Sequence, residues 1–181
     1  MEDLFPTVGR WASGYDREEV EEFFERAKAA YENGEVAMSG ADVRSAAFDL
    51  VRHGYDPAAV DAALDRLETA FIQRDRSEFV ASNSQDAWME QVAEQATSLY
   101  PRLVRPRNER FAPPERGRGY QREAVDDVLD DLVAYFDEGA ELTAADLRSA
   151  TFPAASRSSA YAEGPVDAFL DRAIEILLAV E

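Results

Sequence analysis

One pattern occurs four times in this chain and limits what it can fold into. A tyrosine is followed five residues later by valine, and four residues after that by a bulky apolar residue. The four copies are Tyr15/Val20/Phe24, Tyr55/Val60/Leu64, Tyr120/Val125/Leu129 and Tyr161/Val166/Leu170. Each copy continues with apolar residues three and seven positions later. This spacing predicts a helix with one buried stripe in every copy.

The residues in front of each stripe indicate where the helices begin. Asp16 and Asp56 suit the N-cap, whose side chain accepts a backbone N–H, and Pro57 suits the first helical position. On this register each tyrosine lies just before the cap, and each valine is the fourth helical residue. The two side chains then form a hydrophobic staple. A glycine precedes three of the tyrosines, and we expect a positive φ at Gly14, Gly54 and Gly119.

A second motif occurs twice. Residues 38–48 (Met-Ser-Gly-Ala-Asp-Val-Arg-Ser-Ala-Ala-Phe) match residues 142–152 (Leu-Thr-Ala-Ala-Asp-Leu-Arg-Ser-Ala-Thr-Phe). Ser or Thr followed three residues later by Asp predicts a capping box and a short helix. The order long helix, short capped helix, long helix therefore occurs at about residues 5–72 and again at 111–181, offset by 104 to 106 residues. A tandem duplication is the simplest origin of this order.

The segment between the two halves, residues 73–110, differs from both. Apolar residues at helical spacing predict one more amphipathic helix from Gln85 to about Tyr100. Arg102–Arg118 follows with six arginines and several prolines, and we expect it to be an exposed linker. Convincing strand patterns are absent. The predicted fold is all-α, with two tandem pseudo-repeated halves (1–72 and 111–181) joined by this helix and a Pro/Arg-rich linker.

Composition and charge exclude several classes of function. The chain has no cysteine and a single histidine, His53, which excludes disulfides, thiolate nucleophiles and Cys/His zinc sites. Its net charge of −18 argues against nucleic acid as a partner. No apolar run is long enough to span a bilayer, and Met1 to Leu4 lack the basic start of a secretory signal. We therefore expect a cytoplasmic protein.

The charge is unevenly distributed along the chain. Residues 1–72 hold 16 acids and 7 bases, residues 73–118 hold 7 and 8, and residues 119–181 hold 14 and 4. The halves therefore carry −9 and −10 around a middle of +1. We expect the arginines of the linker to complement the acidic halves, with an anionic lipid, an acidic partner or RNA as the alternative.

Some residues resemble chemical sites but have a simpler interpretation. His53 is interpreted as a loop residue. Four aspartates, Asp126, Asp127, Asp130 and Asp131, could suggest a cation site, yet their spacing predicts a solvated helix face. We expect no catalytic, cofactor-binding or metal-binding residue. An enzyme that uses two carboxylates is kept as an alternative, and it would require an apolar cleft.

Two arginines recur in the short capped helices, Arg44 and Arg148. We expect them to pair with the acids that recur in the long helices, and a role at an interface is the alternative. Those acids are Asp61, Asp65, Asp167 and Asp171.

The motifs together resemble the N-terminal domain of DivIVA-type bacterial scaffolds of cell division and polar growth. The match is best over residues 39–71, where the matching residues fall in order. These are Asp42, Val43, Arg44, Phe48, Gly54, Tyr55, Asp56, Val60, Asp61, Leu64 and Asp65. With four motifs in register, the whole chain resembles the DivIVA domain repeat proteins.

This resemblance implies a non-enzymatic adaptor that binds other proteins in cell division or cell-envelope growth and needs no cofactor. DivIVA scaffolds dimerise through a long coiled coil, but here the stripes stop after about four turns, at Gly34, Arg74 and Gly139. The two halves could instead pack together as a pseudo-dimeric monomer, and a homodimer is the alternative. The candidate interaction or repeat-motif residues are Tyr15, Val20, Arg44, Tyr55, Val60, Tyr120, Val125, Arg148, Tyr161 and Val166.

Membrane contact in the resembled family comes from an exposed apolar residue beside a basic one in the loop before Gly-Tyr. Only Arg10 and Trp11 combine these properties here. We expect Trp11 to be buried. The alternative is a peripheral binder of anionic lipid at the inner face of the membrane, at the poles or septum, that uses Arg10, Trp11 and Arg102–Arg118.

Overall fold

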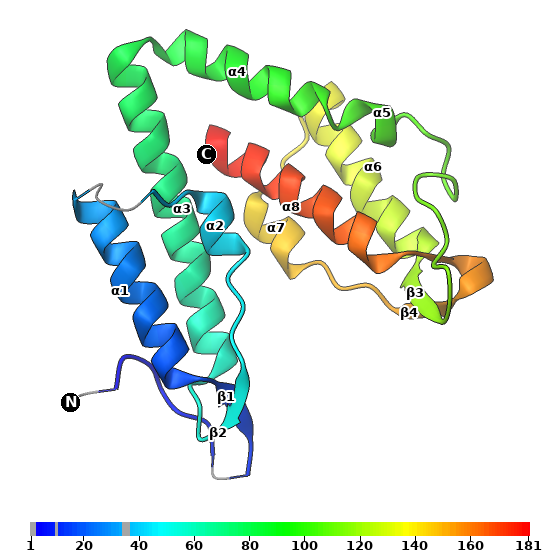
Figure 1. Cartoon of the computed structure of the whole chain (residues 1–181). Helices are drawn as coiled ribbons and strands as arrows, with labels where there is room; N and C mark the ends of the chain where they lie inside the picture. Colours follow the sequence, from blue (N-terminus) through cyan, green and yellow to red (C-terminus); the bar gives the residue numbers. More distant parts are fainter. Residues whose placement is uncertain (1–2, 10, 34–36) are drawn as a thin grey trace. The chain divides into compact units, whose positions relative to one another are not determined.

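A computed structural model describes residues 3–9, 11–33 and 37–181 (Figure 1). The chain is mostly helical and divides into two compact units, unit 1 (Met1–Phe79) and unit 2 (Val80–Glu181). Each unit also contains a small antiparallel sheet. The all-α expectation is therefore not confirmed as stated, because segments expected to be loops form strands of two to four residues.

Unit 1 is built on two long helices, α1 (Arg17–Asn33) and α3 (Pro57–Ser82), with the short helix α2 (Gly40–Arg44) between them in the chain. Strand β1 (Ser13–Tyr15) pairs with β2 (Leu50–Arg52), and the register places Tyr15 opposite Leu50. The buried stripes predicted for the long helices form the core. Its fully buried side chains include Val20, Val43, Tyr55, Val60 and Phe71.

Unit 2 contains the helices α4 (Gln85–Thr97), α5 (Tyr100–Leu103), α6 (Arg122–Glu138), α7 (Ala144–Ser149) and α8 (Glu163–Val180). Its sheet has the order β4-β3-β5, with β3 at Arg118–Gln121, β4 at Ala154–Ser156 and β5 at Ala160–Tyr161. A short 3₁₀ helix, Arg157–Ser159, connects β4 to β5. Helix α4 packs on α8, where the indole Nε1–H of Trp88 donates to the Ala179 carbonyl at 2.9 Å.

The helix starts are where the sequence predicts them. Asp16 accepts the backbone N–H of Glu18 at 2.9 Å, and Asp56 accepts that of Ala58 at 3.1 Å. Both predicted capping boxes are present, Ser39 with Asp42 and Thr143 with Asp146. All four staple valines lie at the fourth helical position and are fully buried. Local capping rules therefore determine how each long helix begins.

The glycines in front of the tyrosines have a different role from the predicted one. In the described chain, positive φ occurs at Gly117 and Gly139 among the glycines, and not at the three predicted positions. These positions are instead sites of close backbone contact. A Cβ on Gly14 would lie 2.2 Å from the Tyr55 carbonyl oxygen, and one on Gly119 would lie 2.1 Å from that of Tyr161. Any side chain here would prevent the strands from crossing.

Two predicted boundaries also need correction. Helix α3 continues to Ser82, two turns beyond the predicted stop at Arg74. Helix α6 does end at Gly139, which is left-handed with φ 73°, whereas the predicted stop at Gly34 lies outside the described residues. The segment Arg102–Arg118 is not an exposed linker throughout, because Leu103, Arg110 and Phe111 are buried in unit 2.

Candidate functional site

Every staple valine is followed by an acid, and each acid interacts with a tyrosine hydroxyl, with geometric hydrogen bonds at Glu21 and Asp126. The pairs are Tyr15 with Asp61, Tyr55 with Glu21, Tyr120 with Asp167 and Tyr161 with Asp126. The pairing is crossed within each unit, because the tyrosine before one long helix bonds to the acid of the other. Each unit therefore contains two reciprocal ties between the starts of its long helices.

The backbone at the same place repeats this exchange. In unit 1 the Tyr15 N–H donates to the Tyr55 carbonyl at 2.9 Å, and the Tyr55 N–H donates back to the Tyr15 carbonyl at 2.8 Å. In unit 2 Tyr120 on β3 lies opposite Tyr161 on β5 in an antiparallel pair. Glycine before Tyr15, Tyr55 and Tyr120 leaves room for this close approach of the backbones, whereas Ala160 precedes Tyr161.

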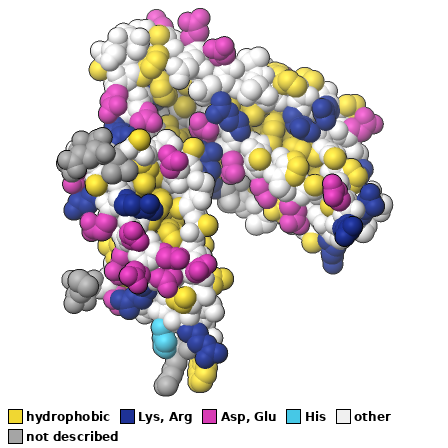
Figure 2. Space-filling view, viewed as in Figure 1, with side chains coloured by type: hydrophobic (Ala, Val, Ile, Leu, Met, Phe, Trp, Pro, Cys, Tyr) yellow, Lys and Arg dark blue, Asp and Glu magenta, His cyan; other side chains and the backbone are white. Residues whose placement is uncertain are grey.

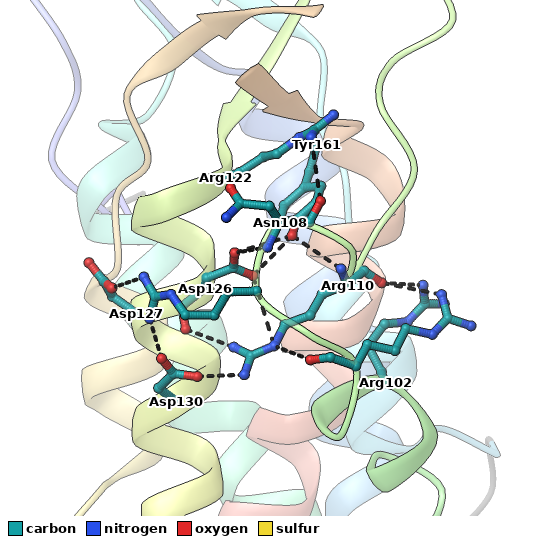
Figure 3. A network of polar contacts seen from close by, with 10 residues as sticks. Arg102, Asn108, Arg110, Arg122, Asp126, Asp127, Asp130 and Tyr161 are labelled. Atoms are coloured by element: carbon teal, nitrogen blue, oxygen red, sulfur yellow. Dashed lines mark hydrogen bonds and ion pairs between the residues drawn. The ribbon is translucent and has the colours of Figure 1, made fainter. Parts of the chain in front are cut away.

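An extensive polar network surrounds Tyr161 and Asp126 in unit 2 (Figure 3). The Tyr161 hydroxyl donates to Asp126 Oδ1 at 3.0 Å and accepts the backbone N–H of Arg110 at 3.1 Å. The backbone N–H of Asn108 donates to Asp126 Oδ2 at 2.7 Å. Asp126 and Tyr161 are fully buried, so the carboxylate is bonded on both oxygens and closed to solvent.

Arg110 joins this network to the surface of α6. Its buried guanidinium donates to the Asp126 carbonyl at 2.8 Å and pairs with Asp130 (Figure 3). Arg107 pairs with Asp130 and also with Asp127 at 2.5 Å. Two arginines of the supposed linker are thus neutralised by α6, which confirms charge complementarity for this part of the segment.

Tyr55 has matching contacts in unit 1. Its hydroxyl bonds to Glu21 and accepts the backbone N–H of Leu4 at 3.1 Å. The Arg17 guanidinium lies 5.2 Å from the Tyr55 ring centre, as Arg122 lies 5.4 Å from that of Tyr161. A phenylalanine ring meets each tyrosine edge-on at about the same distance: Phe5 lies 5.5 Å from Tyr55, and Phe111 lies 5.4 Å from Tyr161.

Burial and charge act on the acidity of these groups. Burial raises the pKa of the Tyr55 and Tyr161 hydroxyls, and the carboxylates that they contact raise it further. Both hydroxyls therefore remain protonated donors at neutral pH. Burial also raises the pKa of Asp130, but hydrogen bonds from Arg110 and Arg107 outweigh it and lower the pKa below its usual value.

The solvated-face interpretation of the four aspartates of α6 is wrong for Asp126. This residue is fully buried, and Asp130 is held by two arginines. A signal was present in the sequence, since an acid follows the staple valine in all four copies. Its meaning depends on a tyrosine about 35 residues away, and helical spacing alone gives no information on that contact. The described part of the chain contains no group of three or more acids or histidines placed to hold a metal ion.

The repeat-motif arginines lie in the short helices α2 and α7. The Arg44 guanidinium pairs with Glu68 of α3, and its Nε–H donates to Glu68 Oε1 at 2.7 Å. Glu68 is itself buried, so this ion pair fixes α2 on α3. Arg148 lies in α7 and is partly buried. The staple valines, with Tyr55 and Tyr161, are fully buried and cannot contact a partner while the units are folded.

Exposed apolar side chains lie around the β1–β2 pair of unit 1. The exposed fraction is 86% for Trp11, 64% for Leu50 and 55% for Leu4. We call these three residues the apolar tip. Figure 2 shows hydrophobic and basic side chains together at this end of the unit, with the single histidine in cyan. The expectation that Trp11 is buried is therefore wrong, and its predicted neighbour Arg10 lies outside the described residues.

Comparison of the chain with protein-family models, with curated proteins and with solved structures found no match. Among the described residues, none of the helices is both long enough and apolar enough to cross a bilayer. Function is therefore inferred from the crossed tyrosine pairs, the apolar tip and the sequence motifs.

Proposed function

We propose that this chain is a non-enzymatic adaptor that binds another protein through the apolar tip. The observation that carries the proposal is the exposure of Trp11, two residues before β1, and of Leu50 on the paired strand β2. Contiguous exposed apolar side chains mark interaction sites, and tryptophan is enriched among the residues that dominate binding energy. The crossed tyrosine pairs supply a rigid base for this surface.

The resemblance to DivIVA-type scaffolds supplies the biological setting of the proposal. A cytoplasmic adaptor in bacterial cell division or polar envelope growth fits a chain that carries four copies of their motif. The matched contacts of Tyr55 and Tyr161 support a tandem duplication as the origin of the two units. Reciprocal pairing within each unit also supports a second idea, that one unit of this chain corresponds to a dimer of single-motif chains.

A second candidate function is attachment to a membrane surface, and the exposure of Trp11 favours it as well. Tryptophan prefers the boundary between lipid headgroups and acyl chains, and Arg52 is an exposed base on β2. The other predicted lipid contact is weaker, because Arg107 and Arg110 already pair with α6. One aromatic anchor with few bases gives only marginal membrane affinity.

Site-specific cross-linking in cells tests the adaptor proposal. A photo-reactive phenylalanine analogue replaces Trp11 in one variant and Val104 in the other, and Val104 is a matched control because it is apolar and 73% exposed in unit 2. We expect a discrete protein cross-link from position 11 and none from position 104. The same products from both positions, or none from position 11, would contradict the proposal.

Co-sedimentation with vesicles separates the second candidate from the first. Purified chain is mixed with anionic and with neutral vesicles over a range of salt concentrations. Binding to anionic vesicles that weakens with salt and is lost in Trp11→Ser would identify a membrane-surface protein. The adaptor proposal expects no sedimentation at low salt.

A further inference from the structure

A groove of about 550 Å³ lies within unit 2, between α4 and the C-terminal ends of α6 and α8. Its floor is apolar and buried, formed by Val92, Ala96 and Ile176. Met89 and Ala93 line one side from α4 and are both exposed, with 41% of Met89 accessible. An exposed methionine over a buried apolar floor is typical of surfaces that accept a partner's apolar side chains.

The opposite side of the groove is held in shape by aromatic contacts. The Phe136 ring lies 6.0 Å from that of Tyr100 and 5.1 Å from that of Tyr135. The Tyr100 hydroxyl donates to Asp137 at 2.8 Å, which fixes the ring against α6. Helix α6 stops at Gly139, where a Cβ would meet nothing within 4 Å, so this end of the groove is open.

The dimensions of the groove suit a short helix. On the α4 side, the lining residues run from Met89 to Tyr100. At the helical rise of 1.5 Å per residue, this stretch is about 16 Å long, or roughly three turns. A helix that lies in an apolar groove presents anchors at positions i, i+3 or i+4, and i+7. Three turns are enough for one such set of anchors.

The sequence segments that line the groove carry charged side chains of one sign. No lysine or arginine occurs in residues 85–101, 123–147 or 173–181, which include all the lining residues. Exposed acids occur in the same segments. They include Asp86, Glu90, Glu94, Asp137, Glu138, Glu141 and Glu181. An apolar groove among acids complements an apolar stripe flanked by bases.

We propose that this groove binds an amphipathic helix of a partner protein, with the apolar stripe of that helix against Val92 and Phe136 and its lysines or arginines facing the surrounding acids. A second copy of this chain is a poor occupant, because two chains of −18 repel each other. The groove lies in unit 2 and shares no residue with the apolar tip, so the proposal does not depend on the function of the tip.

A defined peptide tests this directly. The probe is a fluorescein-labelled peptide of about 18 residues containing only leucine and lysine, with leucine at i, i+3, i+4 and i+7. Fluorescence anisotropy with the full chain measures its Kd at several salt concentrations. We expect Ala93→Arg, which places a base in the groove, to weaken binding by at least about tenfold. Ala145→Arg is the matched control, since Ala145 is exposed on α7 outside the groove and the charge change is the same.

The outcomes separate this proposal from its alternatives. Equal weakening by Ala93→Arg and Ala145→Arg, or equal binding of a peptide of the same composition without an apolar face, would show general attraction to an acidic chain and overturn the proposal. No binding of the amphipathic peptide would overturn it too. A dimer of the chain alone that Ala93→Arg converts to monomer would assign the groove to a second copy instead. Trp11→Ser should leave peptide binding unchanged, whereas it removes partner or vesicle binding at the tip.

Discussion

The apolar tip of unit 1 and the matching end of unit 2 show how one backbone arrangement can support two different surfaces. Both ends have a crossed tyrosine pair, with a short strand pair beside it. The residues of the apolar tip have counterparts in unit 2. Arg110 corresponds to Leu4, Arg116 to Trp11 and Ala154 to Leu50. The Arg110 side chain is buried and pairs with Asp130, whereas Leu4, at the matching position of unit 1, is exposed.

The two units differ in the polar contacts that they bury beside the tyrosine pair. Unit 2 buries a charged network beneath its strands, which adds hydrogen bonds but also the cost of removing charges from water. Unit 1 has a simpler contact between Tyr55 and Glu21, and it presents apolar side chains to solvent. We infer that unit 2 is the more sensitive to loss of a single polar group and that unit 1 supplies the contact surface at this end.

The largest expected effect is the loss of Asp126. Asp126→Ala leaves the buried Tyr161 hydroxyl and the partly buried Asn108 N–H without their acceptor, and should lower the free energy of unfolding of unit 2 by about 3–4 kcal/mol. Glu21→Ala, the matching change in unit 1, should cost only about 1–2 kcal/mol because Glu21 is partly exposed. Hydrogen exchange of α6 and α1 peptides at increasing urea concentration measures both values.

The control for this pair is Asp127→Ala, an exposed aspartate next to Asp126 whose loss removes one surface ion pair. It should change the free energy of unfolding by less than about 1 kcal/mol. If Glu21→Ala lowered the free energy of unfolding as much as Asp126→Ala, the tyrosine–acid contact would matter equally in both units. The proposed contrast between the units would then be wrong.

The strand crossing gives the next largest effect. Gly119→Ala places a Cβ 2.1 Å from the Tyr161 carbonyl oxygen, and overlap of this kind should cost about 2–3 kcal/mol. Gly54→Ala should cost as much in unit 1, although unit 2 has Ala160 at the matching position. Gly9→Ala is the control, because a Cβ there meets nothing within 4 Å. Thermal unfolding followed by circular dichroism ranks the three variants, and a tolerated Gly54→Ala would mean that this position accepts a Cβ, as the matching position with Ala160 does.

The helices of this fold could be predicted because their causes are local. Capping by Asp16, the box at Ser39 and the buried stripe each depend on residues within a few positions. The crossing of the strands could not be predicted, because it depends on contacts between tyrosines some 40 residues apart. Burial of Asp126 and exposure of Trp11 were missed for the same reason, since each depends on a distant segment that covers the residue or leaves it open.

Acid should affect the two units unequally. In unit 2, hydrogen bonds from Arg110 and Arg107 outweigh burial and lower the pKa of Asp130, and the Thr143 hydroxyl lowers the pKa of Asp146. An aspartate with a lowered pKa stabilises the fold above its unfolded value of about 3.9, and this stabilisation is lost as the pH falls through the folded value. Unit 2 should therefore lose stability from both groups below about pH 4.

Unit 1 contains two aspartates whose shifts oppose each other. The Ser39 hydroxyl lowers the pKa of Asp42, whereas burial raises the pKa of Asp61. Acidification removes stability at Asp42 and restores some at Asp61, because a raised pKa favours the protonated folded state. Hydrogen exchange at about pH 5 and pH 3, corrected for intrinsic rates, should show a larger loss of protection in α6 than in α1. Asp130→Asn should reduce the difference between the units, and equal loss in both would contradict the contrast.

The smallest expected effect concerns the starts of α3 and α8, which differ in their caps. Asp56 caps α3, whereas Ala162 at the same position of α8 makes no side-chain cap bond. Ala162→Asn supplies an acceptor for the free N–H of Gly164 without adding charge to an acidic chain, and should stabilise unit 2 by about 0.5–1 kcal/mol. Ala145→Asn, at an exposed position inside α7, has no cap to form and should be slightly destabilising. If Ala162→Asn gave no gain in urea unfolding, the backbone ties between Tyr120 and Tyr161 would already fix the start of α8, and crossing rather than capping would control how the long helices of unit 2 begin.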